Sequence, residues 1–163
     1  MKTLPIVWQR LVFGGETCPR CAGTGDEVER AYQQLRQQLI PLGIEPVLET
    51  REIDEATFKA NPSESNRVWI AGKPVEEWVS ATVGSSQCCS VCGDSECRTV
   101  EVGGTSYEVV PEELLVKAGL IAALAMNAQP AERERNMGSG EQVQTGSQST
   151  PSCCSPTKSG GCG

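Results

Sequence analysis

The spacing of apolar residues changes along the first part of the chain. Residues 4–13 are almost continuously apolar and end at Gly14-Gly15, which is typical of a buried strand followed by a loop. From Val28 to Leu39 apolar residues recur every three or four positions, the spacing of an amphipathic helix. The pattern therefore predicts a strand followed by a helix.

Sequence signals mark both ends of this predicted helix. Thr24 and Glu27 have the spacing of a capping box, so we expect the helix to begin after Thr24. Gly23 and Gly25 delay its start in this interpretation, because glycine is a poor helix former. Pro41 ends the helix, since proline cannot continue the hydrogen-bond ladder.

The segment after this helix predicts two further strands. Residues 44–53 alternate in part between apolar and polar, and Asp54 is placed to cap a short helix that ends before Pro62. Residues 67–70 form a short third strand. Residues 84–97 are polar and rich in cysteine, and we expect them to form a loop inserted into the domain.

A hairpin and a helix complete the predicted domain. Residues 99–110 contain two strand-like segments around Gly103-Gly104, and glycine supplies the positive φ values of a two-residue turn. Pro111 suits the first position of a helix that continues to residue 126. The order of elements predicts one α/β domain over residues 1–126.

The composition changes after this domain. Residues 127–163 consist mainly of Gln, Ser, Gly, Glu, Thr and Pro, with almost no apolar residues to bury. We expect a disordered linker that ends in a Cys-rich tail.

Charge argues against one class of partner. The chain has 14 basic and 21 acidic side chains, a formal net charge of −7, and no cluster of Lys and Arg, so no nucleic-acid partner is expected. The apolar run near the N-terminus is broken by Gln9 and Arg10 and is too short for a secretory signal or a membrane span. We therefore expect a cytoplasmic protein without a membrane partner.

Nine cysteines and no histidine are the most unusual part of the composition. In a reducing compartment such a pattern is more often metal-binding or catalytic than a disulfide framework. Their neighbours are mostly polar or glycine, so we do not treat them as ordinary buried apolar residues. All nine are candidate metal ligands, in three groups: Cys18 and Cys21; Cys88, Cys89, Cys92 and Cys97; and Cys153, Cys154 and Cys162.

The first group has two chemical interpretations. A CxxC pair between a strand and a helix suits redox chemistry, with Cys18 as nucleophile and Cys21 as resolving thiol, because a helix N-terminus stabilises a thiolate. A delayed helix start would leave Cys18 out of reach of the helix dipole, and the charge of Arg20 would compensate. The segment CPRCAGTG also resembles the zinc-knuckle repeat of DnaJ-type co-chaperones. A zinc site of four thiolates needs a second pair, and Cys89 and Cys92 have the required CxxC spacing.

The other two groups favour soft ions. Four thiols in one loop suit a thiophilic metal or metalloid, whereas a disulfide-clipped loop would suit an oxidising compartment. Cys153, Cys154 and Cys162 supply the three sulfurs that As(III) or Sb(III) takes in a pyramid. This tail resembles the Cys-rich C-termini of arsenic-handling proteins, including arsenite methyltransferases and arsenic metallochaperones.

Most of the predicted domain resembles one family. The segments ETCPRCAGTG, ESNRVWIAGKPVEEWV and CCSVCGDSECRTVEVGGTSYEVV are similar to an uncharacterised family of short thioredoxin-like proteins, catalogued as a domain of unknown function, over residues 4–126. The resemblance implies a thioredoxin-like three-layer fold with a Cys-rich loop insertion. The proline that faces the CxxC pair in thioredoxins would fall near residues 65–67, where this chain has Asn66.

Three functions follow from these observations. The first is thiolate-based binding and transfer of a soft ion, As(III) or Zn, with a redox or metal-transfer protein as partner. The second is a thiol–disulfide oxidoreductase that uses Cys18 and Cys21, with the loop cysteines as a shuttle. The third is a zinc-stabilised domain that binds another protein. We expect the first, because nine thiols exceed the needs of one redox pair.

Overall fold

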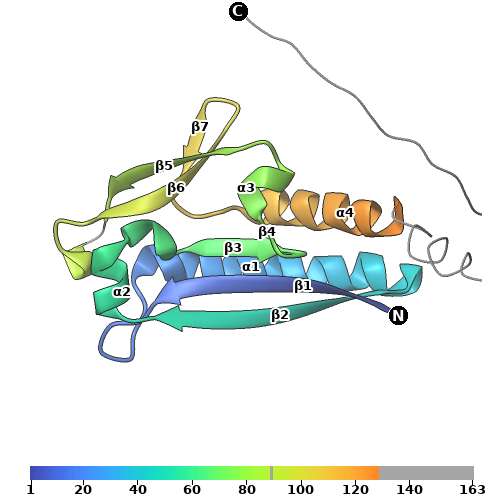
Figure 1. Ribbon diagram of the computed structural model, residues 1–163, viewed down its shortest axis with the longest axis horizontal. Coiled ribbons are helices and arrows are strands. Elements are labelled where there is room, and N and C mark those ends of the chain that lie inside the picture. The colour runs from blue at the N-terminus through green and yellow to red at the C-terminus, as the bar shows by residue number, and fades with distance from the viewer. Residues whose placement is uncertain (89, 129–163) are drawn as a thin grey trace, which may run out of the picture. The chain divides into compact units, whose positions relative to one another are not determined.

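The computed structural model describes residues 1–88 and 90–128. These residues form two β-sheets and four α-helices (Figure 1), which confirms the predicted α/β class. The first sheet has the order β2-β1-β3-β4 and consists of β1 (Lys2–Leu11), β2 (Ile44–Ile53), β3 (Arg67–Ile70) and β4 (Lys73–Pro74). The second sheet has the order β5-β6-β7 and consists of β5 (Thr82–Gln87), β6 (Glu96–Val102) and β7 (Thr105–Tyr107).

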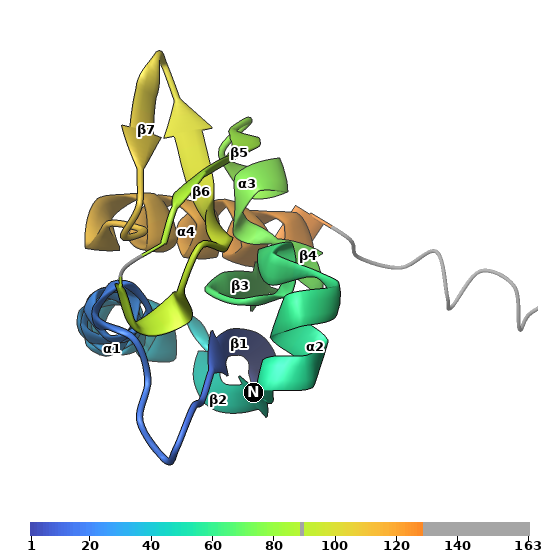
Figure 2. The same cartoon turned by 90° about the vertical axis from the view of Figure 1, so that its left-hand side faces the viewer.

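Helices lie on both sides of the first sheet. They are α1 (Pro19–Leu39), α2 (Glu55–Ala60), α3 (Val75–Trp78) and α4 (Glu112–Ala128), with short 3-10 helices η1 (Ile40–Leu42), η2 (Pro62–Glu64) and η3 (Ser90–Cys92). Figure 2 shows α1 and α2 on opposite sides of the sheet, and α4 packs against α1. Among the described residues, no helix is long and apolar enough to cross a membrane.

The core is built around β1, the central strand. It pairs in parallel with β2 and antiparallel with β3, and α1 provides the crossover that parallel pairing requires. Leu4, Ile6 and Trp8 alternate along β1 and are buried in one core with Val28 and Leu35 of α1. Removing these side chains from water is the main force that holds α1 on the sheet.

The first helix begins earlier than the sequence predicted. α1 starts at Pro19, with Cys18 as its N-cap residue, rather than after Thr24. Proline suits this position because its missing N–H would have no partner within the helix. The start of α1 is therefore set by the CxxC motif itself.

Gly23 and Gly25 lie inside α1, so the prediction that they delay the helix was wrong. The reason for these glycines is close packing. A Cβ on Gly25 would lie 2.9 Å from two ring carbons of Trp8, and a Cβ on Gly23 would lie 2.9 Å from a methyl carbon of Val109. Both contacts are closer than real Cβ atoms allow, so glycine lets α1 approach β1 and the segment before α4.

Thr24 and Glu27 also have a different role from the predicted capping box. The buried Thr24 hydroxyl accepts a hydrogen bond from the Val110 N–H at 3.2 Å. The Glu27 carboxylate accepts one from the Glu112 N–H at 2.8 Å, at the start of α4. Both side chains therefore tie α1 to the segment that leads into α4.

The predicted loop of residues 84–97 is only partly a loop. Residues 82–87 form β5, an edge strand that pairs antiparallel with β6. The pattern of apolar residues did not predict β5, because none of its residues is buried and it shows no apolar alternation. The loop proper is limited to residues 88–95 and connects the two strands.

Several predicted features are confirmed. Gly103 and Gly104 have φ values of +58° and +83° and form the turn between β6 and β7. Asp54 caps α2, where its carboxylate accepts a hydrogen bond from the Thr57 N–H at 2.8 Å. The boundary between domain and tail at residue 126 stays a prediction.

Asn66 precedes β3 and takes a left-handed φ of 57°, a conformation that asparagine tolerates better than most residues. It is buried, and its Nδ2 donates a hydrogen bond to the Glu108 carbonyl oxygen at 3.1 Å. Asn66 thus links the beginning of β3 to the same segment that Thr24 and Glu27 bind.

The packing of Gly25 against Trp8 predicts a stability effect. Replacing Gly25 with alanine inserts a methyl group into a filled space, which typically costs about 1–3 kcal/mol. The better helix propensity of alanine offsets at most about 1 kcal/mol. We expect chemical denaturation of Gly25→Ala to give a lower free energy of unfolding than the parent. Gln37→Ala, on the exposed side of α1, is the matched control and should keep the free energy of unfolding within about 0.5 kcal/mol of the parent value.

Candidate thiol site

Cys18 occupies the N-cap position of α1. Its backbone is extended, and its sulfur accepts a hydrogen bond from the Cys21 N–H at 3.4 Å. The sulfur therefore lies at the positive end of the helix dipole, where negative charge is stabilised. The expectation that the dipole does not reach Cys18 was wrong, because it depended on a helix start after Thr24.

Cys21 lies one turn further into α1 and is only 2% exposed. A hydrogen bond with Cys18 holds the pKa of the Cys21 thiol far above its ordinary value, and burial and the charges of Cys18 and Cys92 act in the same direction. The CxxC pair is thus asymmetric: Cys18 is the sulfur placed to carry charge, and Cys21 retains its proton.

The loop between β5 and β6 is closed by a disulfide. Cys88 and Cys97 are bonded, with their Cα atoms 5.1 Å apart, and the Cys88 N–H donates to the Ser95 carbonyl oxygen at 2.9 Å. The sequence argument favoured four thiols in this loop over a disulfide clip, whereas the structure contains the clip. Cys18, Cys21 and Cys92 carry thiol groups.

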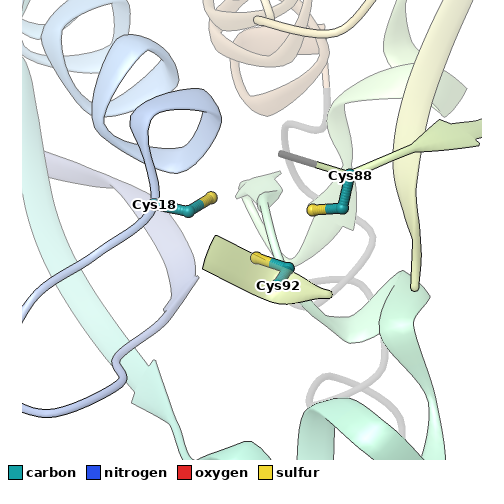
Figure 3. Close-up of side chains that lie close together, drawn as sticks. All are labelled: Cys18, Cys88 and Cys92. Atoms are coloured by element: carbon teal, nitrogen blue, oxygen red, sulfur yellow. The ribbon is translucent and has the colours of Figure 1, made fainter. Parts of the chain in front are cut away.

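Members of the first two cysteine groups of the sequence meet in space. The Sγ atoms of Cys18, Cys88 and Cys92 all lie within 4.8 Å of one another. In Figure 3 these three sulfurs point toward a common space, one from the start of α1 and two from the loop. We call the five residues Cys18, Cys21, Cys88, Cys92 and Cys97 the thiol cluster.

The thiol cluster is largely buried. The Cys88–Cys97 disulfide packs in a small apolar group with Leu11 and Phe58. Cys18 is 3% exposed, whereas Cys92 is half-buried. A cavity of about 310 Å³ is lined by Cys92 together with Leu11, Phe13, Glu55, Phe58, Lys59, Ser90, Gly93 and Ser95. Cys92 is therefore the cluster sulfur that combines partial exposure with a place on a cavity wall.

A second cavity lies beside Cys88. It has a volume of about 380 Å³ and is lined by Pro19, Arg20, Gln87, Cys88, Glu108 and Val109. Cys88 and Cys92 thus lie on the walls of different cavities.

Arg20, between the two cysteines of the CxxC motif, holds the loop over Cys18. Its Nη2 donates to the Ser86 hydroxyl at 2.9 Å and to the Gln87 carbonyl oxygen at 3.1 Å, and it forms an ion pair with Glu108 at 2.7 Å. The Arg20 side chain is 7% exposed. Its main contacts are thus with the end of β5, just before Cys88.

The sequence analysis assigned Arg20 to the thiolate and gave no role to Glu108. The signal that could have found the contact is the position of Arg20 on α1. Arg20, Thr24 and Glu27 follow at helical spacing, so their side chains lie on one face and can bind one segment. All three bind residues 108–112, and we call them the polar stripe of α1.

Four of the predicted ligands lie outside the described residues: Cys89, Cys153, Cys154 and Cys162. Of the four-thiolate zinc set, the structure places Cys18 and Cys92 close together, whereas Cys89 belongs to this undescribed group. Cys97 lies in the disulfide and Cys21 next to Cys18. Five of the nine predicted site residues are thus gathered in one place.

Comparison with known proteins identifies the family. A model described as "Domain of unknown function (DUF2703)" matches residues 4–119, which is more than half of the chain. The chain belongs to the DUF2703 family. This DUF2703 protein is also similar to a protein of Archaeoglobus fulgidus described as uncharacterized, with 47% identity over 112 residues that cover 69% of this chain and 82% of the relative. No solved structure matches it.

The asymmetry of the thiol cluster predicts the order in which native thiols react. Among Cys18, Cys21 and Cys92, we expect iodoacetamide to alkylate Cys92 first, because it is half-buried and lines a cavity, whereas the other two are buried. Cys21 should stay unmodified from pH 7 to pH 9, roughly the range of ordinary thiol ionisation, because its pKa lies above this range. Peptide mapping by mass spectrometry measures both. Alkylation of Cys21 as fast as that of Cys92 would contradict the assignment.

Proposed function

We propose that this DUF2703 protein binds and transfers a soft, thiophilic ion of the As(III) type through the thiol cluster. The observation that supports this most directly is the meeting of Cys18, Cys88 and Cys92, whose sulfurs lie within 4.8 Å of one another. No histidine or carboxylate belongs to this group, and a ligand set made only of sulfur selects soft ions.

Three sulfurs match the pyramidal coordination of As(III). Cys88 can act as a ligand only as a thiolate, so the Cys88–Cys97 disulfide has to be reduced before the ion binds. Cys18 lies at the N-terminus of α1, and the helix dipole there lowers the cost of placing a thiolate in a buried site.

Transfer requires further sulfurs near the three ligands. Cys21 lies beside Cys18, and Cys97 becomes a thiol when the disulfide is reduced. Cys92 lines the cavity of about 310 Å³ and is the sulfur at which an arriving ion would be exchanged. A thiol-rich tail or a metal-transfer protein would be a suitable donor.

The proposal includes a thioredoxin-like fold. Its support is the sheet order β2-β1-β3-β4, with β1 and β2 parallel, β3 antiparallel and the CxxC pair at the start of α1. In this assignment β5, β6 and β7 are an insertion between α3 and α4. The insertion carries the second half of the thiol cluster.

Titration with As(III) tests the proposed site. In reduced full-length protein whose three tail cysteines are replaced by serine, we expect one tightly bound As(III) and the loss of about three thiols. We expect Cys18→Ser, Cys88→Ser and Cys92→Ser each to weaken As(III) binding by at least about 10–100-fold. Changes to residues around a metal ligand typically have an effect of this size, and the loss of a ligand itself should cost at least as much. Calorimetry and a free-thiol assay measure both quantities.

Cys97→Ser is the matched control, because it changes a neighbouring sulfur outside the three-sulfur group and should leave the affinity nearly unchanged. A zinc ion that survives purification and involves about four thiols would instead support the zinc-stabilised interaction domain. Equal losses for Cys97→Ser and Cys18→Ser would argue against a defined three-sulfur site.

A second candidate is a thiol–disulfide oxidoreductase. The asymmetry of Cys18 and Cys21 favours it, since one sulfur is stabilised at a helix N-terminus and the other retains its proton. In that function Cys18 attacks a substrate disulfide and Cys21 resolves the mixed disulfide.

The redox candidate predicts catalysed reduction of a small disulfide such as cystine, with dithiothreitol as reductant. Cys18→Ser should lower the rate to that of the uncatalysed reaction, because the attacking sulfur is lost. The variant with three tail serines is the control for unspecific thiols and should keep the parent rate. A Cys18→Ser protein that matches the parent would exclude this function.

A further inference from the structure

The thiol cluster contains both the reactants of a disulfide exchange within one chain. The Cys18–Cys21 pair carries thiols, and the Cys88–Cys97 disulfide lies next to it. The Cys18 and Cys88 sulfurs lie within 4.8 Å of each other, close enough that a rotation of side chains can bring them into contact. Of the two disulfide sulfurs, that of Cys88 belongs to the three-sulfur group with Cys18 and Cys92, whereas that of Cys97 does not.

We infer that Cys18 attacks Cys88 and that the Cys18–Cys21 dithiol and the Cys88–Cys97 disulfide interconvert within the folded chain. The inference depends on the positions of the sulfurs and requires no bound ion. It therefore stands apart from ion binding and adds a redox relay to the cluster.

The exchange has two balanced steps. In the first, the Cys18 thiolate forms a bond to the Cys88 sulfur, the Cys88–Cys97 bond breaks, and Cys97 leaves as a thiolate that takes up a proton. In the second, Cys21 loses its proton and attacks Cys18, and Cys88 is released as a thiolate. Two electrons pass from Cys18 and Cys21 to Cys88 and Cys97, so no outside oxidant or reductant is needed.

The two isomers of the one-disulfide protein differ in the sulfurs that they offer. With Cys88 and Cys97 bonded, the three-sulfur group of Cys18, Cys88 and Cys92 lacks a thiolate at Cys88. With Cys18 and Cys21 bonded, the sulfurs of Cys88 and Cys92 in the loop and of Cys97 at the start of β6 are all thiols. The exchange thus moves ligand capacity from the start of α1 to the loop without a change in overall oxidation state.

The arrangement of the loop helps to keep the reaction internal. Arg20 binds Ser86 and Gln87, immediately before Cys88, and so fixes the loop above Cys18. The disulfide is buried with Leu11 and Phe58, which restricts attack by outside thiols. Cys18 is therefore in a better position than an external thiol to reach Cys88.

Disulfide mapping of the full-length protein tests this relay. Protein with three tail serines is reduced, oxidised with one equivalent of diamide, equilibrated, quenched in acid, alkylated and analysed by mass spectrometry. We expect both Cys18–Cys21 and Cys88–Cys97 disulfides in the same preparation. In the double variant Cys21→Ser/Cys97→Ser, neither partner sulfur remains to break the mixed disulfide between Cys18 and Cys88. We therefore expect this variant to accumulate the Cys18–Cys88 disulfide.

Cys92→Ser is the matched control, because Cys92 is as close to the other two sulfurs but is absent from the inferred path. It should retain both disulfides, whereas Cys18→Ser should retain Cys88–Cys97 alone. Two results together would overturn the relay. The parent would contain only the Cys88–Cys97 disulfide, and the Cys21→Ser/Cys97→Ser protein would contain no Cys18–Cys88 disulfide. Circular dichroism of the variant that matches the parent would show that the variant is folded. Because no ion is present, failure here leaves the As(III) titration unaffected.

Discussion

The polar stripe of α1 is the constraint on which the thiol cluster depends. Arg20, Thr24 and Glu27 lie on one face of the helix and bind three positions in residues 108–112. Arg20 also binds the end of β5, and a buried arginine without these partners would be costly. One face of one helix thus determines both where α4 begins and where the Cys-rich loop lies.

This constraint explains why the two proposed functions, redox chemistry and ion binding, would use the same atoms. The sulfur that the helix N-terminus stabilises, Cys18, is also the one that the loop approaches. A thiolate in that position is a good nucleophile and a good soft ligand for the same physical reason, because its sulfur is deprotonated and polarisable. Under the two proposals, oxidation and ion binding would compete for Cys18 and Cys88, because a sulfur in a disulfide cannot act as a thiolate ligand.

Local patterns in the sequence predicted the elements that bury apolar side chains. The run of residues 4–13, the helix to Leu39 and the Gly103-Gly104 turn were all correct, because burial and glycine geometry leave a clear periodic or compositional signal. β5 was missed because it buries nothing. The CxxC pair was predicted to lie between a strand and a helix, and its role stays a prediction.

The errors have a common origin in contacts between distant residues. Gly25 was interpreted as delaying the start of the helix, whereas Trp8 from β1 occupies the space that a side chain would need. Thr24 was interpreted as a cap, whereas its hydroxyl binds Val110. The proximity of Cys18 and Cys88 is of the same kind, since their separation in sequence carries no distance information.

The burial of Cys18 has a consequence for what can reach the cluster. Cys18 is 3% exposed, and the cavity at Cys92 measures about 310 Å³, near the lower end of the 300–1,000 Å³ or so that small-molecule pockets occupy. A partner that approaches the cluster from outside would therefore meet the half-buried Cys92 before the buried Cys18.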